Sequence, residues 1–196
     1  MENRCVYLFM VVMVAITSLQ PTSIGAQIEA RRIDDEYAVY SALIRTKYVT
    51  NSTKLVLVFA QTSANPDDGS PPDRDDLRLT PIAQSTIDAY KTKSKVVRVL
   101  KDEFDLPVRY TLIKKEEWDE MFRQDNFSGW KNLYKRYPEA TGIIRVSEIG
   151  FNLERTQALV YVEHGCSATC GQGGYALLSK EGDVWKVQKE VMFMAA

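Results

Sequence analysis

The polar residues best suited to chemistry gather in the last third of the chain. Glu163, His164 and Cys166 stand close together, and Cys170 follows four residues after Cys166. A cysteine–histidine hydrolase needs a free thiolate within hydrogen-bond reach of an imidazole, and two side chains on one face of a strand need not touch. One histidine in the whole chain argues against a zinc centre, and no G-x-S-x-G nucleophile elbow is present. These residues therefore assign no catalytic group and no metal ligand.

Carboxylates offer a second kind of chemistry. A glycosidase places two of them across a cleft. Glu148 and Glu163 are the best candidates, because both fall on expected strands where partial burial could raise their pKa. The simpler interpretation is that each faces solvent on the polar side of its strand. Five residues are kept as candidate binding or cleft residues: Glu148, Glu163, His164, Trp130 and Tyr175.

The tryptophans allow two interpretations. Trp118, Trp130 and Trp185 suit a core or the edge of a cleft, and they could also form a platform on which a carbohydrate stacks. The glycines at 171, 173 and 174 do not form a phosphate-binding loop, because they lead into an expected strand and not into a helix. We expect no bound cofactor.

The first 26 residues resemble a secretory signal peptide in their order of regions. Arg4 precedes an apolar run of about 12–14 residues, and a small residue, Ala26, precedes Gln27. A retained membrane anchor is the alternative, but about 20 apolar residues are needed to span a bilayer. We therefore expect residues 1–26 to be cleaved and the protein to be exported, to the periplasm or outside the cell, without a stable membrane span.

Cysteine usage fits export. Cys5 would leave with the signal peptide, so Cys166 and Cys170 remain as a pair in an oxidising compartment. We expect a disulfide that fixes a glycine-rich turn at residues 165–174. A redox-active pair is the sharper alternative, but its usual spacing is Cys-x-x-Cys. Free thiols or metal ligands remain a third possibility.

Composition restricts the partners. The formal net charge is −1, which gives no reason to expect nucleic acid or an anionic membrane as a partner. We expect an unknown protein or a small-molecule ligand. Five aspartates in the loop at residues 61–80 suggest a cation site, but their spacing does not match an EF-hand, and a solvated loop is the simpler interpretation. The basic residues at 91–101 suggest either a ligand-binding strip or a half-buried extended segment.

Periodicity predicts one α+β domain over residues 27–196. Helices are expected at 34–49, 81–93, 114–122 and 127–137, and strands at 54–60, 108–113, 141–149, 157–163, 174–179 and 184–193. Acids at 34–36 are interpreted as the first turn of the first helix, and Pro81 as the first residue of the second, with Thr80 as its cap. The sheet should be mainly antiparallel, with a C-terminal four-stranded meander, a disulfide-clasped hairpin and helices packed on it.

A set of residues over about 55–194 resembles an exported bacterial family of uncharacterised proteins. The residues that carry the likeness are Asp105-Leu106, Tyr110-Thr-Leu-Ile113, Phe122, Gly129-Trp130, Tyr134, Arg136-Tyr137-Pro138, Gly142, Ser147, Gly150-Phe151-Asn152, Gln157–Val162, Gly171, Gly173, Tyr175, Leu177-Leu178, Lys180 and Trp185-Lys186-Val187. No activity or cofactor accompanies the family pattern. The resemblance therefore implies export and a single domain, and it assigns no catalytic residue.

Function follows only in outline. We expect a non-enzymatic accessory or binding protein, and the alternative is an extracytoplasmic hydrolase that uses acid–base carboxylates. A hydrolase should bring at least two of five polar groups together in a deep cleft: Glu148, Glu163, His164, Asp105 and Glu117. A binding protein should show an apolar or aromatic groove and scattered carboxylates.

Overall fold

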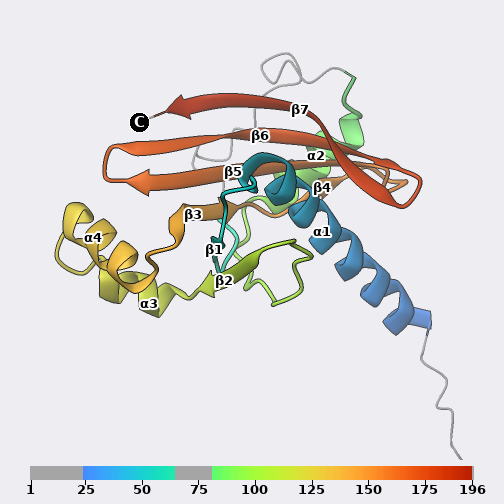
Figure 1. Cartoon of the computed structure of the whole chain (residues 1–196). Coiled ribbons are helices and arrows are strands. Elements are labelled where there is room, and N and C mark those ends of the chain that lie inside the picture. The colour runs from blue at the N-terminus through green and yellow to red at the C-terminus, as the bar shows by residue number, and fades with distance from the viewer. Residues whose placement is uncertain (1–23, 65–80, 196) are drawn as a thin grey trace, which may run out of the picture.

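The computed structural model describes residues 24–64 and 81–195 (Figure 1). Its elements are α1 (Ile24–Tyr48), β1 (Leu55–Phe59), α2 (Gln84–Lys93), β2 (Arg109–Ile113), α3 (Lys115–Met121), α4 (Asn126–Arg136), β3 (Ala140–Val146), β4 (Gly150–Phe151), β5 (Gln157–Ser167), β6 (Cys170–Glu181) and β7 (Val184–Ala195). Most of the expected signal peptide and of the acidic loop at 61–80 lies outside the described residues. The last three residues of that signal form the start of α1.

One mixed sheet of seven strands organises the fold. Its order is β2-β1-β3-β5-β6-β7, and the short β4 pairs with β5. β1 is parallel to both β2 and β3, whereas β3, β5, β6 and β7 are antiparallel to their neighbours. The expected α+β fold with a C-terminal four-stranded meander is therefore confirmed. The expectation did not include the parallel pairing of β1 or the strand β4.

Helices cover both faces of the sheet. α1 packs on one face with alternate strand residues such as Val58, Ile144 and Val160. Leu57 and Leu159, which point the other way along the same strands, pack on the opposite face with α3 and α4 or with α2. Figure 1 shows α1 running obliquely across the strands. All five residues of β1 are buried, as expected for a strand covered on both sides.

Ion pairs fix the middle of α1 on the sheet. The carboxylate of Asp35 accepts hydrogen bonds from Lys180 at 2.7 Å and from Arg155 at 3.0 Å. The carboxylate of Glu36 accepts one from Arg98 at 2.8 Å. Since α1 begins at Ile24, these acids lie in the middle of the helix, and their interpretation as first-turn acids is wrong. Asp35 and Glu36 instead form ion pairs with cations that come from the strands and loops.

The start of α2 also differs from the expectation. The helix begins at Gln84 and not at Pro81, and its N-cap residue, Ala83, has no side chain that can cap it. Gln157, far away in the sequence, supplies the acceptor: its Oε1 lies 2.7 Å from the Ala83 backbone nitrogen and 3.0 Å from Thr86 Oγ1. A tertiary contact thus replaces the local cap, because it satisfies one of the free N–H groups at the helix start.

The disulfide hairpin contains more strand than expected. β5 continues to Ser167 and β6 begins at Cys170, so only residues 168 and 169 form the turn, and the expected ten-residue glycine-rich turn is wrong. The Cys166–Cys170 disulfide lies at this tip. Gly174 is needed for packing and not for a turn, since a Cβ there would lie 2.1 Å from the carbonyl oxygen of Val191 on β7.

The segment after α2 is more exposed than the half-buried segment expected from its pattern. Val96, Val97 and Val99 are 57%, 53% and 64% exposed. Arg98 turns in the other direction, toward the two carboxylates that it binds.

Candidate functional site

The adjacent residues Glu163 and His164 point to opposite faces of the sheet, as neighbours on a strand must. The His164 ring packs against Tyr48 of α1, with ring centroids 5.2 Å apart. Both line a cavity of about 260 Å³ at one end of α1. Burial lowers the pKa of His164, so the imidazole is neutral near pH 7. No other candidate site residue lines this cavity.

Glu163 lies on the face covered by α3 and α4. It is directly opposite Arg145 on β3, but the two side chains form no ion pair among the described residues. The Arg145 guanidinium instead lies over two aromatic rings, 3.8 Å from the centroid of Phe59 and 4.5 Å from that of Trp118. Burial lowers the pKa of Arg145, and the charge of Glu163 opposes that effect. The negative charge of Glu163 therefore favours the protonated form of the packed Arg145 side chain.

Glu148 is buried, and its negative charge is compensated by an ion pair with Arg98. Its Oε1 accepts a hydrogen bond from Arg98 Nε at 2.7 Å, and the same guanidinium binds Glu36. Burial disfavours the charged form of Arg98, but the hydrogen bond and charge of Glu148 outweigh it and raise the arginine pKa above its ordinary value. A carboxylate held in this way by a permanent cation is a poor general acid or base.

Trp130 and Tyr175 lie in separate aromatic clusters. Trp130 is 8% exposed and packs against Trp118, Phe122 and Tyr134. Tyr175 is 1% exposed and meets Tyr90 and Tyr161 edge to face. Neither ring offers a free face on which a sugar could stack. The five candidate residues thus have different surroundings and do not form one site.

The two cysteines are joined, so neither is a free nucleophile. Tyr134 of α4 donates a hydrogen bond to the carbonyl oxygen of Cys166 at 2.7 Å. This contact holds the hairpin tip against α4, and the disulfide closes the same tip.

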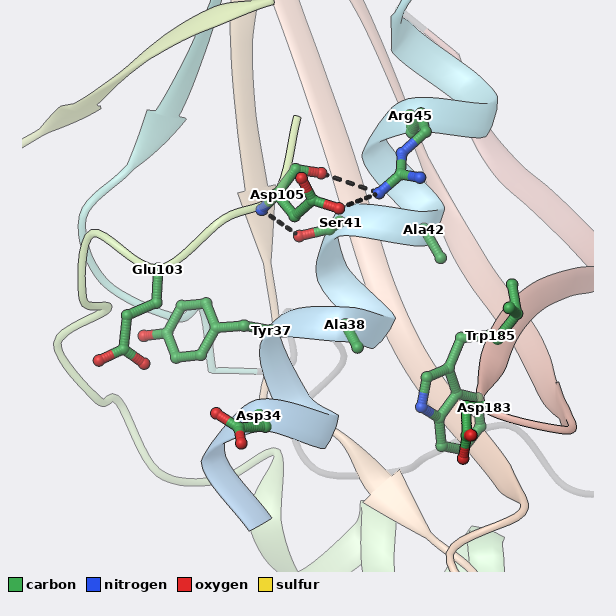
Figure 2. Close-up of a pocket in the computed structure, with 11 residues that line it drawn as sticks. Asp34, Tyr37, Ala38, Ser41, Ala42, Arg45, Glu103, Asp105, Asp183 and Trp185 are labelled. Carbon is green, nitrogen blue, oxygen red and sulfur yellow. Dashed lines mark hydrogen bonds and ion pairs between the residues drawn. The ribbon is translucent and has the colours of Figure 1, made fainter. Parts of the chain in front are cut away.

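The groove in Figure 2 is a site that the sequence did not indicate. It has a volume of about 390 Å³ and runs along the outer face of α1. Its lining residues are Asp34, Tyr37, Ala38, Ser41, Ala42, Arg45, Glu103, Asp105, Asp183, Val184 and Trp185. The α1 residues recur at intervals of three and four, so they share one face of the helix. The loop at 103–105 forms one wall, and the β6–β7 turn forms the other.

The wall at 103–105 is tied to α1 by polar contacts. Asp105 donates its backbone N–H to Ser41 Oγ at 2.9 Å, and its backbone and side-chain oxygens accept from Arg45 at 2.9 and 3.0 Å (Figure 2). Tyr37, in the next turn, accepts a hydrogen bond from the backbone N–H of Lys101. Burial raises the pKa of Tyr37, which keeps its hydroxyl neutral. This wall is therefore held in place before any ligand arrives.

The opposite wall and α1 carry polar groups that have no hydrogen-bond partner among the described residues. Trp185 is 4% exposed, and its indole nitrogen is buried without a hydrogen-bond partner. Figure 2 shows that nitrogen on the edge of the ring that faces α1, opposite Ala38. Among the described residues, the carboxylates of Asp34 and Asp183 form no hydrogen bond or ion pair. Buried polar groups in proteins are nearly always satisfied, so an orphaned indole donor at a groove wall requires an explanation.

The charge of the groove is strongly acidic. Among the described residues, its lining carries four carboxylates and one guanidinium, and that guanidinium is already paired with Asp105. None of these lining residues is a histidine, a cysteine or a lysine. In the part of the chain that the structure describes, no group of three His, Cys, Asp or Glu residues is arranged to hold a metal ion. The described lining therefore carries more negative than positive charge.

Few local patterns along the chain indicated this groove. Asp34 was interpreted as a first-turn acid and Asp183 as part of a hairpin turn, and only packing of α1 against β7 brings them near each other. A partial signal was the pair of small residues Ala38 and Ala42, about one turn apart on the same face of α1.

Within residues 24–64 and 81–195, no helix is long and apolar enough to cross a membrane. Comparisons with protein-family models, with curated proteins and with solved structures find no significant match to the chain.

Proposed function

We propose that the protein is an exported, non-enzymatic accessory protein that binds a ligand or a protein partner in the groove along α1. The observation that carries this proposal is the groove itself, which combines a prepared wall, a floor of small residues and unpaired polar groups. Export rests on the signal-type segment at residues 1–26 and on the cysteine pair that remains after its removal.

The dispersal of the polar candidates supports binding over hydrolysis. Hydrolysis by a pair of acid–base carboxylates requires both groups within reach of the same substrate. Glu148 is held by Arg98, Glu163 and His164 lie on opposite sheet faces, and Asp105 is tied to Arg45. Glu117 accepts hydrogen bonds from Tyr137 and Arg136 near α4. Each of these groups already has a structural role or lies alone.

A thermal-shift screen of the chain from Gln27 onward tests the proposal. The probes are metals, sugars, peptidoglycan fragments, lipids, nucleotides and short peptides. A ligand at about 100 times its dissociation constant stabilises the folded state by roughly 2.7 kcal/mol, which is a readable shift. Mass spectrometry of the ligand after incubation should recover it unchanged. Its conversion to a product would overturn the non-enzymatic part of the proposal.

The matched control is Ala38→Leu, which fills the groove. Ala38 is exposed on the groove side of α1, and leucine is a good helix former, so the variant should fold like the wild type. A ligand that binds in the groove should lose its effect in this variant. A ligand that stabilises both proteins equally would place the binding site elsewhere and overturn the assignment of the groove.

A further inference from the structure

We propose that the groove along α1 recognises an extended peptide segment that carries lysine or arginine side chains. This inference rests on the proposed binding function and names the ligand class. Three features of the groove carry it: its unpaired carboxylates, its small-residue floor and the orphaned indole donor of Trp185 (Figure 2).

The carboxylates set the charge of the ligand. Asp34 stands near one end of the groove on α1, and Asp183 projects from the β6–β7 turn on the other wall. Neither has a counterion among the described residues, whereas Asp105 is neutralised by Arg45. Glu103 has only a loose ion pair with Lys101, at 3.8 Å. A lysine or arginine side chain supplies the missing positive charge, and salt should weaken its binding because these carboxylates are exposed.

The floor sets the shape. Ala38 and Ala42 face Trp185 across the groove, and each leaves the space that a longer side chain would fill. The aliphatic stem of a lysine or arginine can lie along such a surface while its charged end stays among carboxylates. One turn of helix separates the two alanines, so the floor suits an elongated ligand.

The indole donor of Trp185 distinguishes a peptide ligand from a simple amine. Trp185 Nε1 needs an acceptor, and an amine or a metal ion brings none. A peptide brings a carbonyl oxygen a few bonds from each charged side chain. Because neighbouring atoms cover the nitrogen, a small rotation of the indole must accompany binding. Lys180 already lies over the Trp185 ring, with its nitrogen 5.7 Å from the centroid, so the ligand's charge is directed to the carboxylates and not to the ring.

The test follows the indole N–H resonance of Trp185 by NMR in the chain from Gln27 onward, with the resonance assigned by Trp185→Phe. The probe is acetyl-Ala-Lys-Ala-Lys-Ala-amide, and the matched probe has norleucine in place of both lysines. The lysine peptide should move the Trp185 resonance downfield and saturably, while the norleucine peptide binds at least tenfold more weakly. Spermidine has the charge without the carbonyl, so it should leave this resonance in place. An equal downfield shift with spermidine would overturn the peptide assignment.

Two charge-matched double variants locate the site. Asp34→Asn with Asp183→Asn should weaken binding of the lysine peptide at least tenfold. Asp88→Asn with Asp119→Asn removes the same charge from α2 and α3, outside the groove, and should leave the affinity within twofold of the wild type. Equal losses in both double variants would mean that net charge alone drives binding, and would overturn the inference.

Failure of this inference and failure of the proposed function are distinguishable. If the lysine peptide is silent but another ligand class from the screen is blocked by Ala38→Leu, only the ligand class is wrong. If the lysine peptide and the whole screen are silent, both proposals fall.

Discussion

Glu36 and Glu148 share a single cation, the guanidinium of Arg98. Glu36 lies on α1 and Glu148 follows β3, and Arg98 donates to them through Nη2 at 2.8 Å and through Nε at 2.7 Å. The side chains of the two acids are 6% and 10% exposed. The arrangement joins α1, the segment after α2 and the sheet, so it helps to position the helix that forms the floor of the groove.

Removing the shared cation should destabilise the protein strongly. Arg98→Met removes the guanidinium that both buried carboxylates bind, and breaking a buried ion pair costs about 3–5 kcal/mol. Arg98 is itself one-third exposed, so we expect a loss of about 3 kcal/mol in the free energy of unfolding. Urea denaturation at pH 7 measures it.

The matched control for Arg98 is Arg109→Met. Arg109 pairs with Glu139 at the surface, and its side chain is 70% exposed. Its loss should cost less than about 1 kcal/mol. Adding Glu36→Gln and Glu148→Gln to Arg98→Met should recover part of the lost stability. A triple variant as unstable as Arg98→Met alone would show that packing, and not charge, holds this site together.

Asp35 should make the stability depend on pH at the acidic end. Burial opposes ionisation of Asp35, but hydrogen bonds and charges from Lys180 and Arg155 outweigh it and hold its pKa below the ordinary value. The folded state therefore binds its proton less readily than the unfolded chain. The stability that Asp35 contributes is complete above the ordinary pKa of about 4 and is lost as pH falls through the lowered folded-state pKa.

Asp35→Asn tests this dependence. At pH 7 the variant should lose about 2 kcal/mol, the usual scale for hydrogen bonds to a charged group. At pH 3 the gap between variant and wild type should narrow. The neighbouring Asp34→Asn is the control: Asp34 is exposed and its carboxylate is unpaired among the described residues, so its loss should change stability by less than about 0.5 kcal/mol. A gap for Asp35→Asn that is constant from pH 3 to pH 7 would contradict the prediction.

The local patterns of the sequence were sufficient for the strands and for most helices. The alternation through Trp185, Val187 and Lys189 predicted β7, and the apolar run at 54–60 predicted the buried strand β1. Such periodicities show which side of an element is apolar. That pattern can be recognised from a short stretch of sequence, whether one or both faces of the strand are covered. The parallel pairing of β1 with β2 and β3 could not be predicted from the sequence, because no local pattern specifies which strand is the partner.

The element ends and the groove required tertiary information. α2 begins where Gln157 can accept hydrogen bonds from it, and nothing near Gln84 in the sequence indicates that contact. Asp34 was interpreted as a first-turn acid because acids are favourable at the N-terminal end of a helix, whereas α1 begins at Ile24. The groove exists only because α1 crosses the sheet beside the β6–β7 turn, which brings Asp34 near Trp185. Sites made from distant segments leave no spacing motif to recognise.

The disulfide should contribute modestly to stability. Cys166 and Cys170 enclose a very small loop, and the hairpin register beside it continues through Ser167 and Cys170. The loop-closure model gives about 2 kcal/mol for so small a ring. Cys166→Ser with Cys170→Ser should therefore fold and lose up to about 2 kcal/mol in the free energy of unfolding, measured by urea denaturation. A thiol titration of denatured, unreduced exported protein should find no free thiol, and one thiol or more per chain would contradict the exported, disulfide-bonded form.

The stability of the folded protein should also fall between pH 7.5 and pH 5.5 because of His164. Burial lowers the pKa of His164, and among the described residues that line its cavity there is a lysine, Lys47, and no carboxylate that would favour an imidazolium. The unfolded chain takes up the proton near pH 6.5 and the folded state does not, so stability is full above that pH and declines below it, by at most about 1.4 kcal/mol per pH unit. His164→Gln should flatten this dependence, as measured by unfolding at both pH values. Since His164 is the only histidine, an equal slope in wild type and variant would mean that the imidazole becomes charged in the folded state as readily as in the unfolded chain.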